Sequence, residues 1–73
     1  PNPTRDAFTL ELPNGLEQKG TLSVFNANGQ LVKQGIIQND KQEWSTTDLP
    51  SGVYYIFVTI ENQIFKEKLV IIQ

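Results

Sequence analysis

Apolar and polar residues alternate with a period of two along almost the whole chain, and this pattern limits the fold more than any other feature. At the start, Phe8, Leu10 and Leu12 share one face, while Thr9 and Glu11 share the other. Successive side chains of a β-strand point to opposite sides of the sheet, so this alternation predicts strands. No window shows a sustained 3.6-residue period with helix caps. The sequence therefore predicts an all-β domain.

Six stretches have strand character, and turn-forming residues separate them. The predicted strands cover residues 8–12, 20–26, 31–37, 42–45, 53–60 and 64–73. Asn28-Gly29 predicts a tight turn, "TTDLPSG" at 46–52 is the strongest turn cluster, and Asn62 predicts a hairpin between the last two strands. Short strands with closely spaced turns favour a small antiparallel β-sandwich of six to seven strands over a closed barrel.

The inward positions of these strands predict the core. Residues 53–60 are apolar on both faces, which is typical of a central strand that is covered on both sides or nearly so. Gly35 interrupts the third strand and predicts a bulge there. The predicted core consists of Phe8, Leu10, Leu22, Val24, Trp44, Tyr54, Ile56, Val58 and Leu69.

Length and composition exclude several classes of protein. A chain of 73 residues forms one domain, close to the lower size limit for a fold held by a single core. It has no cysteine and no histidine, which excludes disulfides and the usual zinc sites. The net charge is −2 and the charged residues are scattered along the chain. This argues against nucleic-acid binding, which needs a stripe of basic residues. No apolar stretch approaches the roughly 18 residues of a membrane helix, so we expect no membrane insertion, and any export signal is expected upstream.

The titratable residues do not suggest catalysis. Without histidine and cysteine, the commonest general base and the strongest nucleophile are missing. The acidic residues fall in loops or at outward strand positions, where solvation explains them. Asp40 and Asp48 are conceivable calcium ligands, but their spacing matches no known oxygen-ligand loop. We expect no enzyme activity, no cofactor and no metal.

Two interpretations are open for Trp44. A large aromatic residue usually fills the core of a small sandwich, but one exposed tryptophan can stack on a sugar ring. Tyr54 and Tyr55 point to opposite faces, so at most one of them lies in the core. A carbohydrate-binding or adhesive module is therefore an alternative function. Exposure of the Trp44 ring would favour this alternative, and burial would count against it. A spacer module of the fibronectin type III kind is a further alternative.

The last predicted strand carries Lys66 and Lys68 on one face and continues into the apolar stretch "LVIIQ". The lysines are either charges that protect a strand edge from aggregation or a docking feature for a partner. Their face also holds Ile64, Val70 and Ile72, so neither face is cleanly apolar. This mismatch predicts two half-strands in different surroundings, which a bulge between them would explain. An apolar strand at a chain end can also add to a partner's sheet edge.

The chain opens with Pro1, Asn2 and Pro3, which predict a stiff, extended lead-in that joins the domain to something upstream. Three further stretches follow it in order: "GTLSVFNANGQLV" at 20–32, "LPSGVYYIFV" at 49–58 and "KEKLVIIQ" at 66–73. In this order the motifs resemble the type A C-terminal sorting domain of proteins exported by the type IX secretion system of Bacteroidota. The resemblance covers nearly the whole chain.

The resemblance implies an immunoglobulin-like β-sandwich that acts as a secretion signal. Residues 1–73 would be a single sorting domain cut from a larger parent protein, and would carry an upstream cargo through the periplasm to the type IX outer-membrane translocon. A sortase-like component would usually remove the domain, leaving the cargo outside the cell or attached to its surface. Many members end in a basic residue, whereas this chain ends at Gln73. The motif residues, which are also the candidates for translocon recognition, are Pro1, Asn2, Pro3, Gly29, Gly52, Tyr54, Lys66, Lys68, Leu69, Val70, Ile71 and Ile72.

Overall fold

The protein folds into six strands, as a computed structural model shows for residues 6–12 and 20–73, the part of the chain that it describes. The strands are β1 (Ala7–Glu11), β2 (Gly20–Asn26), β3 (Leu31–Ile37), β4 (Lys41–Ser45), β5 (Gly52–Ile60) and β6 (Gln63–Ile71). Within the described residues there is no helix, and hence none that could cross a membrane. The predicted lead-in at residues 1–3 lies outside the described residues.

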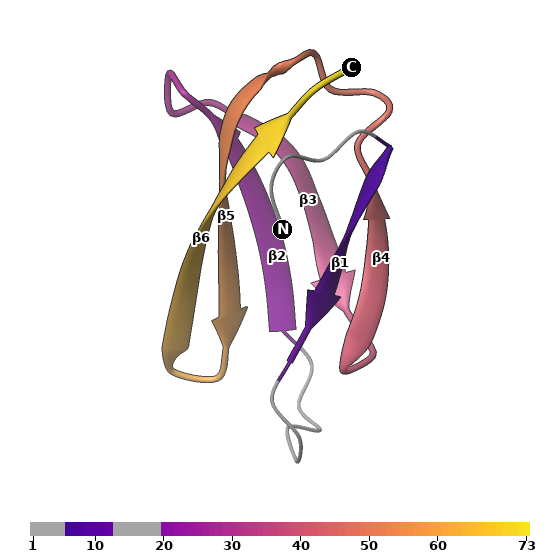
Figure 1. The fold of residues 1–73 in the computed structure, drawn as a ribbon. Helices are drawn as coiled ribbons and strands as arrows, with labels where there is room; N and C mark the ends of the chain where they lie inside the picture. Colours follow the sequence, from indigo (N-terminus) through magenta and orange to yellow (C-terminus); the bar gives the residue numbers. More distant parts are fainter. Residues whose placement is uncertain (1–5, 13–19) are drawn as a thin grey trace.

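The strands form two antiparallel sheets that face each other (Figure 1). The larger sheet has the strand order β3-β2-β5-β6, and β1 pairs with β4 in a two-stranded sheet. Residues 53–60, predicted as a central strand, lie within β5, which has β2 on one side and β6 on the other. The prediction of a small antiparallel β-sandwich is confirmed.

The core lies between the two sheets, and the inward side chains of β2 and β5 form its centre. Each fully buried aliphatic side chain contributes about 1.5–3 kcal/mol to the stability of the fold. Two predicted core residues, Leu10 and Trp44, are only partly buried and pack against the core, because they belong to the narrow two-stranded sheet. The core consists of Phe8, Leu12, Leu22, Val24, Ile37, Leu49, Tyr54, Ile56, Val58, Ile60, Leu69 and Ile71.

The bulge of β3 lies elsewhere than the sequence predicts. Along the β2–β3 pair, Lys33 faces Val24 and Leu31 faces Phe25, so Val32 is the extra residue. Gly35 is regularly paired with Leu22, and the prediction of a bulge at this glycine is wrong. The reason for the glycine is a close approach instead, because the ring of Trp44 occupies the space of a β-carbon at Gly35.

The pairing of β6 with β5 runs without a register shift from Gln63 opposite Ile60 to Ile71 opposite Gly52. The predicted bulge in this strand is therefore wrong. The two halves of β6 nevertheless differ in burial: residues 63–68 are exposed, whereas Leu69 and Ile71 are buried. Figure 1 shows the C-terminal half of β6 leaning across the sandwich, which brings its inward side chains over the core.

Candidate functional site

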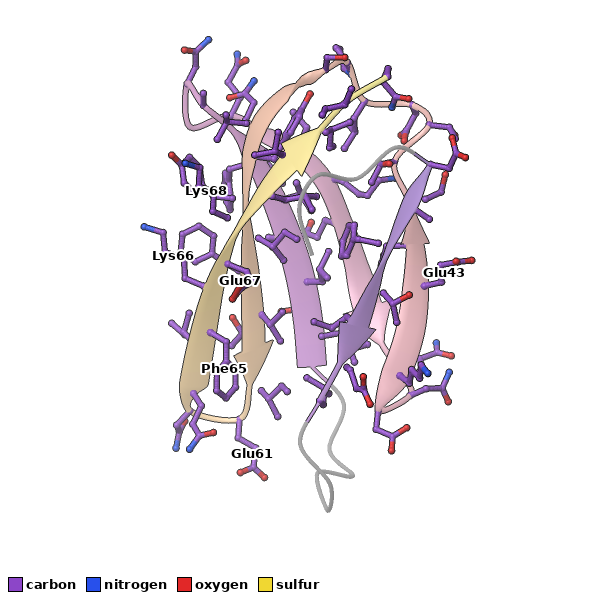
Figure 2. The ribbon with its side chains drawn as sticks, in the orientation of Figure 1. Glu43, Glu61, Phe65, Lys66, Glu67 and Lys68 are labelled. Atoms are coloured by element: carbon purple, nitrogen blue, oxygen red, sulfur yellow. The ribbon has the colours of Figure 1, made fainter. Side chains whose placement is uncertain are left out.

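The terminal motif is divided between the core and the surface. Leu69 and Ile71 are each 1% exposed, so their side chains hold β6 onto the sandwich and cannot contact a partner. Val70 is half-buried, and Ile72 is 45% exposed. Lys66 and Lys68 are exposed and project from one side of β6, whereas Glu67 projects from the other (Figure 2).

The turn glycine of the second motif has a conformational role. Gly29 adopts a φ of 86°, in the left-handed region that favours glycine. Its amide donates to the carbonyl of Asn26 at 2.9 Å. The side-chain Oδ1 of Asn26 accepts hydrogen bonds from the amides of Asn28 and Gln30, also at 2.9 Å. These hydrogen bonds to Asn26 close the β2–β3 hairpin. The residues of this motif therefore have a structural role in the turn.

The third motif fixes the loop that leads into β5. The hydroxyl of Tyr54 donates to the carbonyl of Pro50 at 2.6 Å, while its ring lies in the core. Gly52 pairs with Ile71, which ties the start of β5 to the end of β6. A β-carbon at Gly52 would make only an ordinary contact with the Tyr54 ring, at 3.6 Å. The residues of this motif therefore stabilise the end of the sandwich where the chain terminus also lies.

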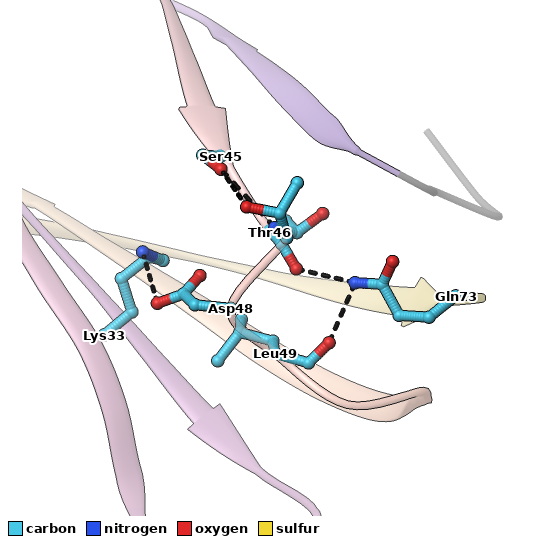
Figure 3. A network of polar contacts seen from close by, with 7 residues as sticks. Lys33, Ser45, Thr46, Asp48, Leu49 and Gln73 are labelled. Carbon is cyan, nitrogen blue, oxygen red and sulfur yellow. Dashed lines mark hydrogen bonds and ion pairs between the residues drawn. The ribbon is translucent and has the colours of Figure 1, made fainter.

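Gln73 closes this end of the sandwich through its side chain (Figure 3). Its Nε2 donates to the carbonyls of Thr46 at 2.7 Å and Leu49 at 2.8 Å. Its backbone amide donates to the hydroxyl of Ser51 at 2.9 Å. Beside these bonds, Lys33 and Asp48 form an ion pair of 3.3 Å. The last residue of the chain therefore holds the β4–β5 loop, a contact that the sequence did not predict.

The outward face of the four-stranded sheet carries a cluster of rings and lysines. Phe25 and Phe57 meet edge to face, with ring centroids 5.5 Å apart and an interplanar angle of 89°. The Nζ of Lys66 lies 5.4 Å from the ring centroid of Tyr55 and 5.8 Å from that of Phe57. Such cation–π contacts hold an ammonium group in place over the rings. We call Phe25, Tyr55, Phe57, Lys66 and Lys68 the aromatic–lysine face.

Comparison with known protein families shows to which family the chain belongs. The model of the secretion system C-terminal sorting domain matches residues 1–73, the whole chain. The chain belongs to this family. Membership means a C-terminal type IX secretion signal that acts with the type IX machinery on an attached upstream cargo, and the pathway ends at the cell surface or outside the cell. Neither the curated proteins nor the solved structures gave a match.

Sequence reasoning missed part of the surface of this sorting domain. It named Lys66 and Lys68 but not Phe25 or Phe57, which meet only because β2 and β5 are neighbours, with Phe25 opposite Tyr55. For the rings, the alternation of β5 predicted only that Tyr54 and Tyr55 point to opposite faces, and the structure confirms it. What the sequence did not give was the order of the strands in the sheet.

The other candidates in the sorting domain have structural explanations. Trp44 packs against the core, and its Nε1 is buried with no hydrogen-bond partner among the described residues. This packing favours the core interpretation over a sugar-binding platform. In the described part of the chain, no group of acidic residues could hold a metal ion, and Asp48 is paired with Lys33.

Proposed function

We propose that the sorting domain carries an upstream cargo protein through the periplasm to the outer-membrane translocon of the type IX system. After export, a sortase component removes the domain, and the cargo is released or attached to the cell surface. The observation that carries this proposal is the match of the sorting-domain family to the whole chain, with the motifs in the expected order. The family is one of signals, and we propose no catalytic step for the domain itself.

The structure supports recognition of a folded domain rather than of a loose terminal peptide. β6 is paired with β5 along its whole length, and Leu69 and Ile71 belong to the core. Releasing this strand for a partner would expose two fully buried side chains, at a cost of about 1.5–3 kcal/mol each. Because a domain this small has little stability to lose, the exposed residues of the motif are the better candidates for translocon contact.

A reporter fusion tests the proposed function. Residues 1–73 are joined to the C-terminus of a reporter with a secretory signal peptide, and the fusion is expressed in a Bacteroidota host with a type IX system. We expect the reporter in the medium or at the cell surface, in a form that has lost the domain. An isogenic strain without the translocon should retain the uncut fusion in the periplasm.

Two controls make this experiment decisive. The same reporter without residues 1–73 should stay in the periplasm of both strains. A fusion with Leu22→Asp, which places a charge in the centre of the core, should be retained as well, because an unpaired buried charge unfolds a small domain. Periplasmic retention of the folded wild-type fusion in the competent host, or its export without the translocon, would overturn the proposal.

A further inference from the structure

The aromatic–lysine face forms one continuous surface over three neighbouring strands. Phe25 on β2 lies opposite Tyr55 on β5, and on β6 Lys66 lies opposite Phe57 and Lys68 opposite Tyr55. The three rings are half-buried, so they form a floor rather than projecting into solvent. A shallow hollow of about 680 Å³ lies over this floor, and its lining also includes Ser23, Thr59 and Ile64.

This face is positively charged although the chain as a whole is negative. The net charge is −2, from eight acidic and six basic residues. None of the described acidic residues occupies an outward position on β2, β3, β5 or β6. Glu67, the one acid within these strands, projects to the other side of β6 from the two lysines (Figure 2). The face therefore combines an apolar floor with a local positive potential.

The chemistry of the face selects among the possible partners. Nucleic acids and anionic lipid surfaces are bound by longer series of basic residues, since each phosphate or lipid contact contributes little alone. Two lysines are too few for either. A sugar ring needs an open aromatic face, but the ammonium group of Lys66 lies over two of the rings. A peptide segment with a carboxylate and apolar side chains matches the exposed ammonium group of Lys66 and the apolar floor.

We propose that the aromatic–lysine face is a docking surface for an acidic, apolar segment of a protein of the secretion machinery. A carboxylate of that segment pairs with Lys66, which the rings hold in place, and an apolar side chain enters the hollow against Phe25 and Phe57. This inference rests on the proposed function, because it names the surface through which the machinery recognises the domain. It assigns recognition to a sheet face rather than to the terminal strand alone.

Charge reversal at one lysine tests the proposal, with a matched reversal on the other sheet as its control. Lys66→Glu and Lys41→Glu change the net charge equally, and both lysines are exposed. In the reporter fusion described above, we expect Lys66→Glu to lower the ratio of exported to periplasmic reporter about tenfold or more, because a glutamate at this position would repel the carboxylate of the docked segment. Lys41→Glu and Lys66→Arg should be exported like the wild type.

Several outcomes would overturn the proposal. Wild-type export of Lys66→Glu, or equal losses for Lys66→Glu and Lys41→Glu, would show that the face is not recognised through its charge. A loss for Lys66→Arg equal to that for Lys66→Glu would do the same. Retention of the wild-type fusion would overturn the proposed function and this inference together, whereas failure of the inference alone leaves the wild type exported. Thermal unfolding of each purified domain shows whether the variants remain folded.

Two measurements on the purified domain distinguish other occupants of the face. Sedimentation with vesicles that contain anionic lipid would, if it depends on Lys66, assign the face to a lipid surface. Analytical ultracentrifugation would assign it to a second copy of the chain if self-association is lost in Lys66→Glu. Either result would contradict docking of an acidic protein segment. We expect no vesicle binding and no self-association that depends on Lys66.

Discussion

The ring of Trp44 lies against Gly35 so closely that a side chain at this glycine has no room. A β-carbon added to Gly35 would stand 2.6 Å from Cη2 of Trp44 and closer still to Cζ3. This contact joins the two sheets, because Gly35 belongs to β3 and Trp44 to β4. The Trp44 ring packs directly onto the backbone of Gly35. This contact explains why a glycine stands opposite the tryptophan.

Gly35→Ala should be destabilising because the ring has to move to accept the new methyl group. We expect a loss of about 1–3 kcal/mol in the free energy of unfolding, as for other overpacked sites. Urea denaturation measures it. In the Trp44→Leu background the same alanine should cost clearly less, since the shorter side chain leaves room. Additive losses in the double variant would contradict the contact.

Trp44 should be replaceable by phenylalanine but not by alanine. Trp44→Ala removes a large packed ring, and we expect a loss of about 3–5 kcal/mol, enough to unfold a marginal domain. Trp44→Phe keeps an aromatic ring and removes the buried Nε1, which has no acceptor among the described residues. An unsatisfied buried donor costs about 1–3 kcal/mol, so its removal should offset most of the lost packing. Equal losses for the two variants in urea denaturation would contradict this account.

Tyr54→Phe should isolate the hydrogen bond that the hydroxyl donates to Pro50. The ring stays in the core, while the carbonyl of Pro50 loses its partner at 2.6 Å. We expect a loss of about 0.5–1.5 kcal/mol in the free energy of unfolding. Tyr55→Phe is the matched control, because Tyr55 lies on the outward face, and its effect should stay within about 0.5 kcal/mol. Equal effects in chemical denaturation would count against a role for the bond.

Gln73→Glu should weaken the closure of the β4–β5 loop. The substitution keeps the shape of the side chain but replaces the donor that serves the carbonyls of Thr46 and Leu49 by an acceptor. We expect a loss of about 1–3 kcal/mol and faster amide hydrogen exchange in residues 46–51. Ile72→Ala, at an exposed neighbour, serves as the control and should leave exchange in the loop unchanged. Unchanged exchange in Gln73→Glu would show that the bonds do not hold the loop.

The sequence predicted the strands well because their signal is local. The β-branched and aromatic run of β5 and the Asn28-Gly29 turn each lie within a few residues, and both are confirmed. Gly35 was misinterpreted because a glycine inside a strand indicates either a bulge or a close approach, and only the position of Trp44 distinguishes them.

The candidate site was less predictable than the strands because it depends on contacts between distant segments. The alternation placed Lys66 and Lys68 on one face. The aromatic rings beside them come together only because β2 and β5 are neighbouring strands, and the sequence did not predict that strand order. The contact of Gln73 with the carbonyls of Thr46 and Leu49 is also non-local, and no motif encodes it. The burial of Leu69 was predicted from the sequence and is confirmed, whereas the burial of Ile71 depends on the path of β6 across the sandwich.

The strand order also determines when this domain can fold. Ala7 faces Ser45 and Gly20 faces Ile60, so the sheets join segments made at very different times during synthesis. Domains dominated by such non-local pairing fold in roughly milliseconds to seconds, and only once every segment is present. A chain that stops or is clipped before β6 lacks Leu69, Ile71 and the whole edge strand, which is more than so small a domain can lose. A folded sorting domain therefore indicates that its polypeptide has been synthesised through β6 and has kept that strand.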